Sequence, residues 1–355
     1  MNINRAKILF ISTRCGFVSG IERYIYDAAA ALKNGGFEVD GMFNSKCRDS
    51  DEFCKVFGNV YDFHDISQMH AGKYDLVFIH IIDNAELLRQ IRLKFKTTVM
   101  VHDHRYQRCP LRMLYHPFRE HQRRQLLAEL RQCDAHMVAS RFMRNELMKN
   151  NFDVAKIVKV YPVCKVSPRR TQIRKPSDIP IVLFVGQLIK EKGILQLMES
   201  MSMVREEFKL WIIGEGSEEK RCIRLVSKLG IAPYVEFMGW SNTPADYYTK
   251  ADIAVFPTIW REPFGLPGVE ANAAGLPVIG YDVGGVSEWL HHERNGLMIS
   301  PGDIRAFADA VETLIQDPGF AGRLGDEGHR WVGTHLSEEN YLSGFKLMLD
   351  RVHSR

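Results

Sequence analysis

The sequence predicts an α/β protein made of two doubly wound domains in tandem. Short apolar runs alternate with longer amphipathic segments, and the runs fall into two series separated by a polar segment that contains two prolines. A length of 355 residues is sufficient for two domains with separate cores. The apolar fraction of 45% and the charged fraction of 25% are typical of a soluble globular protein. No run approaches the roughly 20 apolar residues that a membrane-spanning helix needs.

The first series predicts buried parallel strands, because its runs are short and apolar throughout. The expected strands are Lys7–Ser12, Leu76–His80, Thr97–His102 and Ala135–Ala139. A helix is expected over Ile21–Leu32, where apolar side chains recur at helical spacing, and another from about Arg141.

The second series begins after residue 170 and predicts a second sheet. Its expected strands are Ile181–Val185, Lys209–Ile213, Tyr234–Phe237, Ile253–Phe256 and Pro277–Ile279. Helices are expected between them, for example Glu219–Leu229, and a later helix has Asp303 as its cap.

The boundary between the domains is expected in the segment Val166–Asp178, which has no apolar period and is typical of an exposed linker. We therefore divide the chain into an N-terminal domain, 1–168, and a C-terminal domain, 169–337. A C-terminal helix at about 338–355 is a candidate to pack back on the first domain. Because open α/β sheets bind ligands at the carboxyl ends of their strands, we expect the site in a cleft that the two domains face.

The segment Glu262–Glu270 carries the clearest chemical signal. It follows an expected strand, and Gly265 and Gly268 would let the backbone pass close to a ligand. From about Leu266 the sequence favours a helix, which Gly275 can end. The N-terminus of a helix offers N–H donors and partial positive charge, which suits a diphosphate.

The residues from Glu262 to Val278 read E-P-F-G-L-P-G-V-E-A-N-A-A-G-L-P-V. This segment resembles the mark of glycosyltransferase family 4, the large retaining group with the GT-B fold, in which seven residues separate two glutamates. Other segments also resemble this family: Ser19–Arg23 its N-terminal glycine loop, Gly186–Gly193 its donor loop and Gly214–Gly216 its G-x-G turn. The resemblance implies two Rossmann-like domains and a retaining, metal-independent transfer of a hexose from a nucleotide diphosphate-sugar, with a UDP-sugar as the expected donor.

The resemblance also implies roles for individual residues. Glu262 would contact hydroxyls of the donor sugar, Glu270 the ribose hydroxyls, and Lys192 the diphosphate, whose developing charge a fixed cation stabilises. His102 would face the donor sugar, and it joins Glu262 and Lys192 as a candidate catalytic residue. The expected donor-binding residues are Gly20, Gly186, Gln187, Lys192, Phe264, Gly265, Leu266 and Glu270.

Two further features bear on these assignments. His80 ends the strand that precedes the one carrying His102, and it is a second candidate. Gln187 stands where the family usually has arginine, and a neutral amide does not replace that charge. We expect no metal site. Adjacent strand residues point to opposite faces, which argues against His102–His104, and Asp49–Asp51 lies in a polar loop. We expect no cofactor beyond the nucleotide-sugar co-substrate.

Charge is unevenly distributed between the halves. Residues 1–170 contain 28 Lys and Arg against 18 Asp and Glu, and the remainder contains 19 against 25. Seven arginines lie within Arg105–Arg131, interleaved with apolar side chains. This segment is either a solvated helix face or a surface for an anionic membrane or a lipid-linked acceptor. The acceptor is expected to be a glycan or a lipid-linked group. No nucleic-acid-binding motif accompanies the charge.

The expected location is the cytoplasm, with peripheral attachment to the inner face of the membrane as a hypothesis. The segment before Lys7 lacks the order of a signal peptide, and the seven cysteines include no CxxC pair.

Polysaccharide or glycolipid assembly is the expected process, and three other functions stay open. A nucleotide-sugar epimerase or a phosphorylase on the same fold is disfavoured by the double-glutamate segment. A non-catalytic partner subunit is favoured only by Gln187. A nicotinamide-dependent oxidoreductase is suggested only by the order of strands and helices, since no G-x-G-x-x-G follows the first strand.

Overall fold

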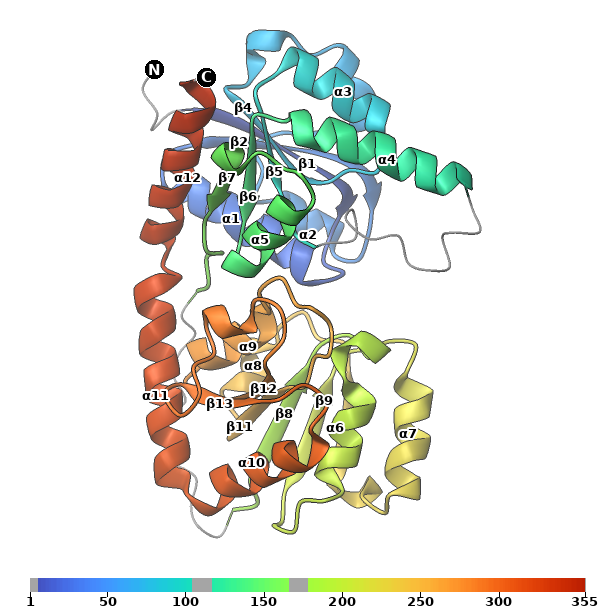
Figure 1. The fold of residues 1–355 in the computed structure, drawn as a ribbon, viewed down its shortest axis with the longest axis vertical. Coiled ribbons are helices and arrows are strands. Elements are labelled where there is room, and N and C mark those ends of the chain that lie inside the picture. Colours follow the sequence, from blue (N-terminus) through green and yellow to red (C-terminus); the bar gives the residue numbers. More distant parts are fainter. Residues whose placement is uncertain (1–5, 104–116, 166–177, 355) are drawn as a thin grey trace. The chain divides into compact units, whose positions relative to one another are not determined.

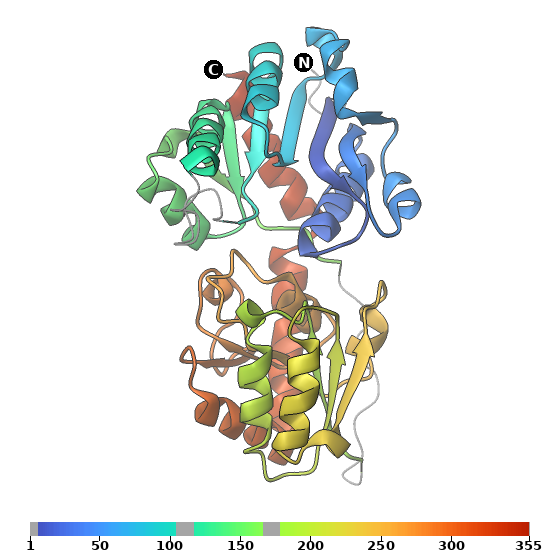
Figure 2. The same ribbon diagram turned by 90° about the vertical axis from the view of Figure 1, so that its right-hand side faces the viewer.

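A computed structural model describes residues 6–103, 117–165 and 178–354 of the chain. The chain divides into two compact units, which are described separately below (Figures 1 and 2). The first unit comprises Met1–Val163 and Glu338–Arg355, and the second Cys164–Ser337. Most of the expected linker lies outside the described residues, as do His104, Arg105, Arg108 and Arg112.

The first unit contains a seven-stranded parallel sheet with the order β3-β2-β1-β4-β5-β6-β7. Its strands are β1 (Lys7–Cys15), β2 (Glu38–Lys46), β3 (Val60–Asp62), β4 (Leu76–Ile81), β5 (Thr97–Met100), β6 (Ala135–Val138) and β7 (Ile157–Lys159). Its helices are α1 (Gly20–Asn34), α2 (Ser50–Cys54), α3 (Ala85–Lys94), α4 (Pro117–Gln132), α5 (Arg141–Lys149) and α12 (Glu338–His353).

Helices cover both faces of this first sheet. Leu88 and Ile91 of α3 share a buried cluster with Leu9 of β1 and Val77 of β4. On the opposite face, Phe345 of α12 packs edge-on against Phe78 of β4, with ring centroids 5.5 Å apart. The last helix of the chain is therefore part of the core of the first unit.

The second unit contains a six-stranded parallel sheet with the order β10-β9-β8-β11-β12-β13. Its strands are β8 (Ile181–Val185), β9 (Lys209–Ile213), β10 (Val235–Gly239), β11 (Ile253–Phe256), β12 (Val278–Tyr281) and β13 (Gly296–Ile299). Its helices are α6 (Ile194–Met201), α7 (Glu219–Lys228), α8 (Ala245–Tyr248), α9 (Leu266–Ala273), α10 (Ile304–Gln316) and α11 (Pro318–His335). Asp303 caps α10 by accepting a hydrogen bond from the N–H of Ala306.

Strand order reverses at one point in each sheet, between β1 and β4 in the first unit and between β8 and β11 in the second. The loops after these neighbouring strands leave in opposite directions, which opens a crevice at the carboxyl edge where doubly wound sheets bind their ligands. In the second unit, the segments after β8 and β11 therefore border this crevice.

Among the described residues, the strands β2, β3, β7 and β13 are missing from the sequence prediction. β2 contains Glu38, Asp40, Asn44 and Lys46, so it lacks the apolar run that identifies the predicted strands. The expected strand Thr97–His102 is shorter in the structure, because β5 ends at Met100 and His102 lies just beyond it. β1 is longer than expected and continues to Cys15.

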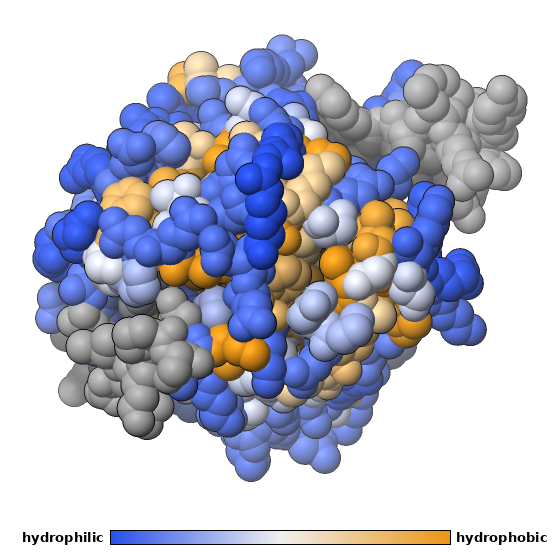
Figure 3. All heavy atoms as spheres, turned by 90° about the horizontal axis from the view of Figure 1, so that it is seen from below, coloured by the Kyte–Doolittle hydropathy of each residue, from blue (hydrophilic) through white to orange (hydrophobic). Residues whose placement is uncertain are grey.

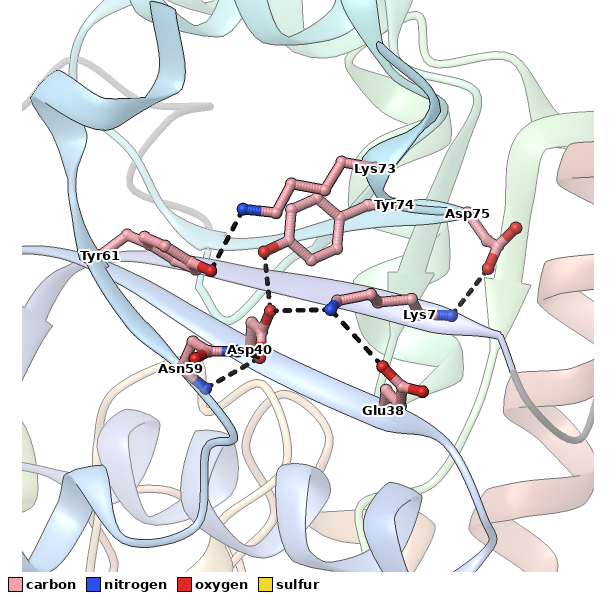
Figure 4. Close-up of polar contacts among 8 residues, drawn as sticks. All are labelled: Lys7, Glu38, Asp40, Asn59, Tyr61, Lys73, Tyr74 and Asp75. Carbon is pink, nitrogen blue, oxygen red and sulfur yellow. Dashed lines mark hydrogen bonds and ion pairs between the residues drawn. The ribbon is translucent and has the colours of Figure 1, made fainter. Parts of the chain in front are cut away.

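A buried polar network explains the charge on β2 (Figure 4). Asp40 is only 2% exposed. It accepts hydrogen bonds from the Tyr74 hydroxyl at 2.8 Å and from the backbone N–H of Asn59 at 2.8 Å, and Lys7 Nζ lies 3.5 Å from it. A buried carboxylate is tolerated when it is paired in this way. Because Lys7 begins β1, the network lies at the amino edge of the sheet, opposite the edge where ligands bind, and we infer a structural role.

No helix of the described residues is long and apolar enough to cross a membrane. Hydrophilic side chains cover most of the face seen in Figure 3, and hydrophobic ones lie among them in small groups.

Candidate functional site

Two loops meet at the carboxyl edge of the second sheet, where the strand order reverses. One loop follows β8 and ends at Gly193, and the other follows β11 and runs to Gly265. The N–H groups of Ile259 and Trp260 both donate to the carbonyl oxygen of Glu191, at 3.0 Å each. The two loops are thus joined through their backbones.

Gly193 makes this close approach possible. Its φ is +69°, and a Cβ atom built on it would lie 1.8 Å from the carbonyl oxygen of Pro257. Any other residue would push the β8 loop away from the β11 loop. This glycine therefore fixes the position of Lys192, the residue before it.

Lys192 and Glu262 form an ion pair across the two loops. Lys192 Nζ lies 2.7 Å from Glu262 Oε2, and the two side chains are 23% and 12% exposed. Thr258, which is buried just after β11, lies with its hydroxyl oxygen 3.3 Å from the same carboxylate oxygen. Lys192 and Glu262 were predicted separately from the sequence, and they lie together in the structure.

Glu270 lies in the second turn of α9 and is held by Tyr248 of α8. The buried Tyr248 hydroxyl is 3.2 Å from Glu270 Oε2 and 3.1 Å from the carbonyl oxygen of Pro267. Neither Tyr248 nor Thr258 was identified from the sequence. Thr258 directly follows an expected strand, whereas nothing in the sequence linked Tyr248 to a residue 22 positions away.

Helix α9 begins at Leu266, as expected, with Gly265 as its N-cap at φ +102°. Gly275 ends the helix: its N–H bonds to the Asn272 carbonyl, and that of Leu276 bonds to the Ala271 carbonyl. These two bonds satisfy carbonyl groups that the last turn would otherwise leave free.

Gly268 has a packing role inside the protein. A Cβ atom at this position would lie 2.2 Å from Cη2 of the fully buried Trp289. Trp289 also donates from Nε1 to the carbonyl oxygen of Phe264 at 2.6 Å. The buried indole of Trp289 therefore contacts both α9 and the loop that leads into it, and it supports that loop.

The remaining predicted residues of the second unit lie around the same loops. Gly186 directly follows β8, and Gln187 is exposed beside it. Phe264 is buried, and Leu266 is partly exposed at the start of α9.

Gly20 lies in the first unit, at the start of α1. Ser19 caps this helix, and its hydroxyl donates to Glu22 Oε2 at 2.6 Å. Glu22 is fully buried, and its Oε1 has no hydrogen-bond partner among the described residues. A carboxylate in the first turn satisfies the positive end of the helix dipole and opposes the binding of an anion there. Arg14 Nη1 lies 3.9 Å from Glu22 Oε1 and partly offsets this charge.

His102 pairs with His80 in the first unit. His80 Nδ1 and His102 Nε2 are 3.1 Å apart, and the rings of Tyr24 and His102 pack edge to face with centroids 4.9 Å apart. Burial lowers the pKa of His102 to about 4 and, with the nearby His102, lowers the pKa of His80 well below its usual value. Both rings are therefore neutral near pH 7 and can act as hydrogen-bonding groups rather than as cations.

The tautomer of this pair follows from burial. His80 Nε2 is buried without a hydrogen-bond partner among the described residues. An unpaired acceptor is tolerated more readily than an unpaired N–H, so we assign the proton of His80 to Nδ1, which donates to His102. His102 then carries its own proton on Nδ1.

The described arginines of the basic segment make contacts within the first unit. Arg123 and Arg124 of α4 both contact Glu120, at 2.7 and 3.0 Å. Arg131 donates to the backbone carbonyl of Asn150 at 2.8 Å. The structure thus gives these three side chains an intramolecular role, and that of Arg119 lies outside the described part.

Solved structures share the fold of the whole chain. Sucrose-phosphate synthase from Thermosynechococcus elongatus aligns with a TM-score of 0.80 at 23% identity, over 99% of this chain and 100% of that one. HepE of Anabaena, in complex with UDP-glucose, aligns with a TM-score of 0.80 at 16% identity, over 99% and 100%. The fold is GT-B.

Sequence comparison adds a family match within this GT-B chain. Residues 167–331, which make up most of the second unit, match the family of glycosyl transferases group 1. Lipopolysaccharide core biosynthesis glycosyltransferase LpsE of Rhizobium meliloti is 28% identical over 184 residues, which are 52% of this chain and 54% of LpsE. Capsular polysaccharide biosynthesis glycosyltransferase CapM of Staphylococcus aureus is 29% identical over 168 residues, 46% of this chain and 44% of CapM. The chain thus spans about half the length of the curated relatives it matches.

Proposed function

We propose that this protein is a glycosyltransferase that moves a hexose from a nucleotide diphosphate-sugar to a hydroxyl acceptor. The observation that carries the proposal is the ion pair between Lys192 and Glu262 at the carboxyl edge of the second sheet, beside the start of α9. Glu270, which lies on α9 and is held by Tyr248, adds a second carboxylate. A cation, a helix N-terminus and two carboxylates together match a ligand with a diphosphate and two sets of sugar hydroxyls.

The proposed roles follow from the chemistry of each group. The ammonium of Lys192 binds the diphosphate, Glu262 accepts hydrogen bonds from donor-sugar hydroxyls, and Glu270 accepts them from the ribose. In the first turn of α9, Pro267 has no N–H and those of Gly268 and Val269 donate to the Gly265 carbonyl. We expect the N–H groups of Gly265 and Leu266 to bind phosphate oxygens.

Ligand binding must rearrange the ion pair. A diphosphate competes with Glu262 for the ammonium of Lys192, and sugar hydroxyls can replace the ammonium as donors to the carboxylate. Once the sugar leaves, the charge that develops on the diphosphate is stabilised by Lys192 and by the N–H groups of α9. In the bound state the sugar therefore contacts Glu262 and the diphosphate contacts Lys192, whereas these two residues pair with each other when no ligand is bound.

We propose that transfer proceeds with retention at the anomeric carbon and without a metal or a cofactor. The acceptor hydroxyl would attack from the side of the leaving group and pass its proton to the departing phosphate. His102, neutral at pH 7, would act as a hydrogen-bonding group toward the donor sugar. HepE, which has the same fold, is in complex with UDP-glucose in its solved structure, and this supports a UDP-sugar as the first donor to test.

The names of LpsE and CapM support a role in cell-surface polysaccharide or glycolipid assembly. The acceptor would be a glycan or a lipid-linked group, and the protein would work in the cytoplasm, attached peripherally to the membrane through Arg105–Arg131. Sedimentation with liposomes at low salt tests the attachment: we expect greater recovery with anionic than with neutral lipid, and equal recovery contradicts it.

Isothermal titration with UDP-, GDP- and ADP-sugars, followed by product analysis with and without acceptor, tests the function. We expect one nucleotide series to bind, and the bound donor to release free nucleotide diphosphate. Conversion of the donor into an epimer without acceptor would indicate an epimerase. Binding without any turnover, including donor hydrolysis, would indicate a non-catalytic subunit.

A further inference from the structure

Two cysteine thiols face each other in the first unit, a feature that the proposed transfer does not use. Cys15 is the last residue of β1 and Cys54 the last of α2. Their Sγ atoms are 3.1 Å apart, although 39 positions separate them in the sequence. Both are free thiols, as are the other cysteines of the described residues.

Packing around α2 holds the two thiols together. Phe53, next to Cys54, is fully buried and its ring contacts those of Phe17, Phe43 and Phe57, with centroids 5.4–5.7 Å apart. On the β1 side, the N–H of Cys47 donates to the carbonyl oxygen of Cys15 at 2.7 Å. Packing on both sides thus holds the two residues so that their sulfur atoms lie next to each other.

The two thiols differ in exposure. Cys15 is only 3% exposed, whereas Cys54 is partly exposed. One partly exposed thiol beside one buried thiol is the arrangement that dithiol–disulfide exchange requires: the first reacts with an outside disulfide and the second displaces it.

We propose that Cys15 and Cys54 form a reversible intramolecular disulfide by exchange with a small-molecule disulfide such as glutathione disulfide. The Cys54 thiolate attacks one sulfur of glutathione disulfide, which forms a mixed disulfide and releases one glutathione. The Cys15 thiolate then attacks Cys54 Sγ and releases the second glutathione. Each protein thiol loses one proton and the pair loses two electrons, which reduce one glutathione disulfide to two glutathione molecules.

The second step is the slow one. Burial, together with the hydrogen bond and charge of Cys54, raises the pKa of Cys15 to about 12. The mixed disulfide removes the Cys54 thiol, and burial still raises the pKa of Cys15. Disulfide closure should therefore speed up with rising pH, and the Cys54 mixed disulfide should accumulate at low pH.

The disulfide would act on the start of α1. Cys15 directly precedes the turn that leads to Ser19, the cap of α1, and the N–H of Phe17 in this turn donates to the Arg48 carbonyl at 2.8 Å. A covalent link from β1 to α2 closes a loop around these contacts and restricts their opening. Oxidation would thus make the start of α1 more rigid, at the carboxyl edge of the first sheet.

The test is to incubate the whole protein with glutathione disulfide and to count free thiols and map disulfide-linked peptides by mass spectrometry. We expect the loss of two titratable thiols, a peptide that links Cys15 to Cys54, and full recovery of both thiols with dithiothreitol. An unchanged thiol count, glutathione adducts alone at high pH, or a different linked pair would overturn the proposal. This readout needs no donor and no turnover, so it is independent of the proposed function.

Two variants sharpen the result. Cys47→Ser removes the half-buried thiol nearest in sequence to this site and should form the same linked peptide as the wild type. Cys54→Ser, at a partly exposed position, should form no link to Cys15. A disulfide between Cys15 and Cys47 in the wild type would mean that Cys47, and not Cys54, is the partner of Cys15, and it would contradict the proposal.

Discussion

Lys192 Nζ lies 2.7 Å from Glu262 Oε2, and this contact joins the loop after β8 to the loop after β11. These two strands flank the point where the order of the second sheet reverses. The ion pair therefore lies where the topology of the sheet creates a binding crevice, and it holds both residues in place before a ligand arrives.

Lys192→Ala and Glu262→Gln should each reduce transfer by roughly 100-fold or more, the usual cost of losing one group that stabilises transition-state charge. We expect both variants to remain folded, although removing one partner of a largely buried ion pair costs up to about 3–5 kcal/mol of stability. The measurement is the initial rate of nucleotide diphosphate release at saturating donor, together with circular dichroism.

The matched control is Lys190→Ala, which removes an exposed lysine from the same short turn. Its rate should equal that of the wild type. Near-normal turnover of Lys192→Ala or Glu262→Gln would remove that residue from the mechanism.

Tyr248→Phe should weaken binding of a nucleotide diphosphate about 10-fold, because Glu270 loses the hydroxyl that holds its carboxylate. If Glu270 binds the ribose, the wild type should prefer UDP to 2′-deoxy-UDP, and the variant should lose much of this preference. Isothermal titration with both nucleotides measures the two effects. Tyr247→Phe, on the same helix, is the control, and equal affinities in wild type and Tyr248→Phe would disprove the positioning role.

Gly268→Ala should destabilise the second unit by about 1–3 kcal/mol, since its methyl group would collide with the buried Trp289. The comparison is Gly322→Ala on α11, where a Cβ atom meets nothing within 4 Å. That change should stabilise the helix by up to about 1 kcal/mol. Denaturant unfolding followed by tryptophan fluorescence measures both, and equal midpoints for the two variants would contradict the packing argument.

The first unit should lose stability as the pH falls below about 6.5. Burial lowers the pKa values of His102 and His136 to about 4, and that of His80 falls well below its usual value. The unfolded chain therefore binds more protons than the folded one between about pH 6.5 and 4, and protonation favours unfolding in this window. The loss at pH 5 is about 2 kcal/mol for each histidine whose folded pKa is near 4.

Calorimetric unfolding at pH 7 and pH 5 tests this pH dependence. His102→Gln should reduce the loss of stability between pH 7 and pH 5 by the contribution of one histidine. His64→Gln, at a side chain that is 96% exposed, is the comparison variant. A melting temperature that does not change with pH in the wild type would contradict the expectation.

Much of the second unit could be predicted from its sequence because most of its strands are apolar runs and two of its site residues, Lys192 and Glu262, lie in the loops after them. The expected strand over Ile181–Val185 has the bounds of β8, and the expected start of α9 at Leu266 is its start in the structure. The first unit was harder to predict, because the charged Asp40 interrupts the apolar pattern of β2. Its burial is tolerated because a polar network that includes the Tyr74 hydroxyl pairs its carboxylate. Tyr248 was missed because its partner is fixed by the packing of α8 on α9, which no spacing along the chain reveals.

The sequence by itself indicated the kinds of group that the site contains: a lysine and a glutamate in the loops after two strands, and a second glutamate on the helix that follows. The order of strand, loop and helix follows from local propensities, which depend on neighbouring residues, whereas the roles of Lys192, Glu262 and Glu270 were predicted from the resemblance of their motifs to a known family. Tertiary structure decided which groups meet: Lys192 with Glu262, Tyr248 with Glu270, Gly268 with Trp289, and Cys15 with Cys54. Each of these contacts depends on the order of strands in a sheet or on the close approach of two packed elements, and both are set by the burial of apolar surface across the whole unit.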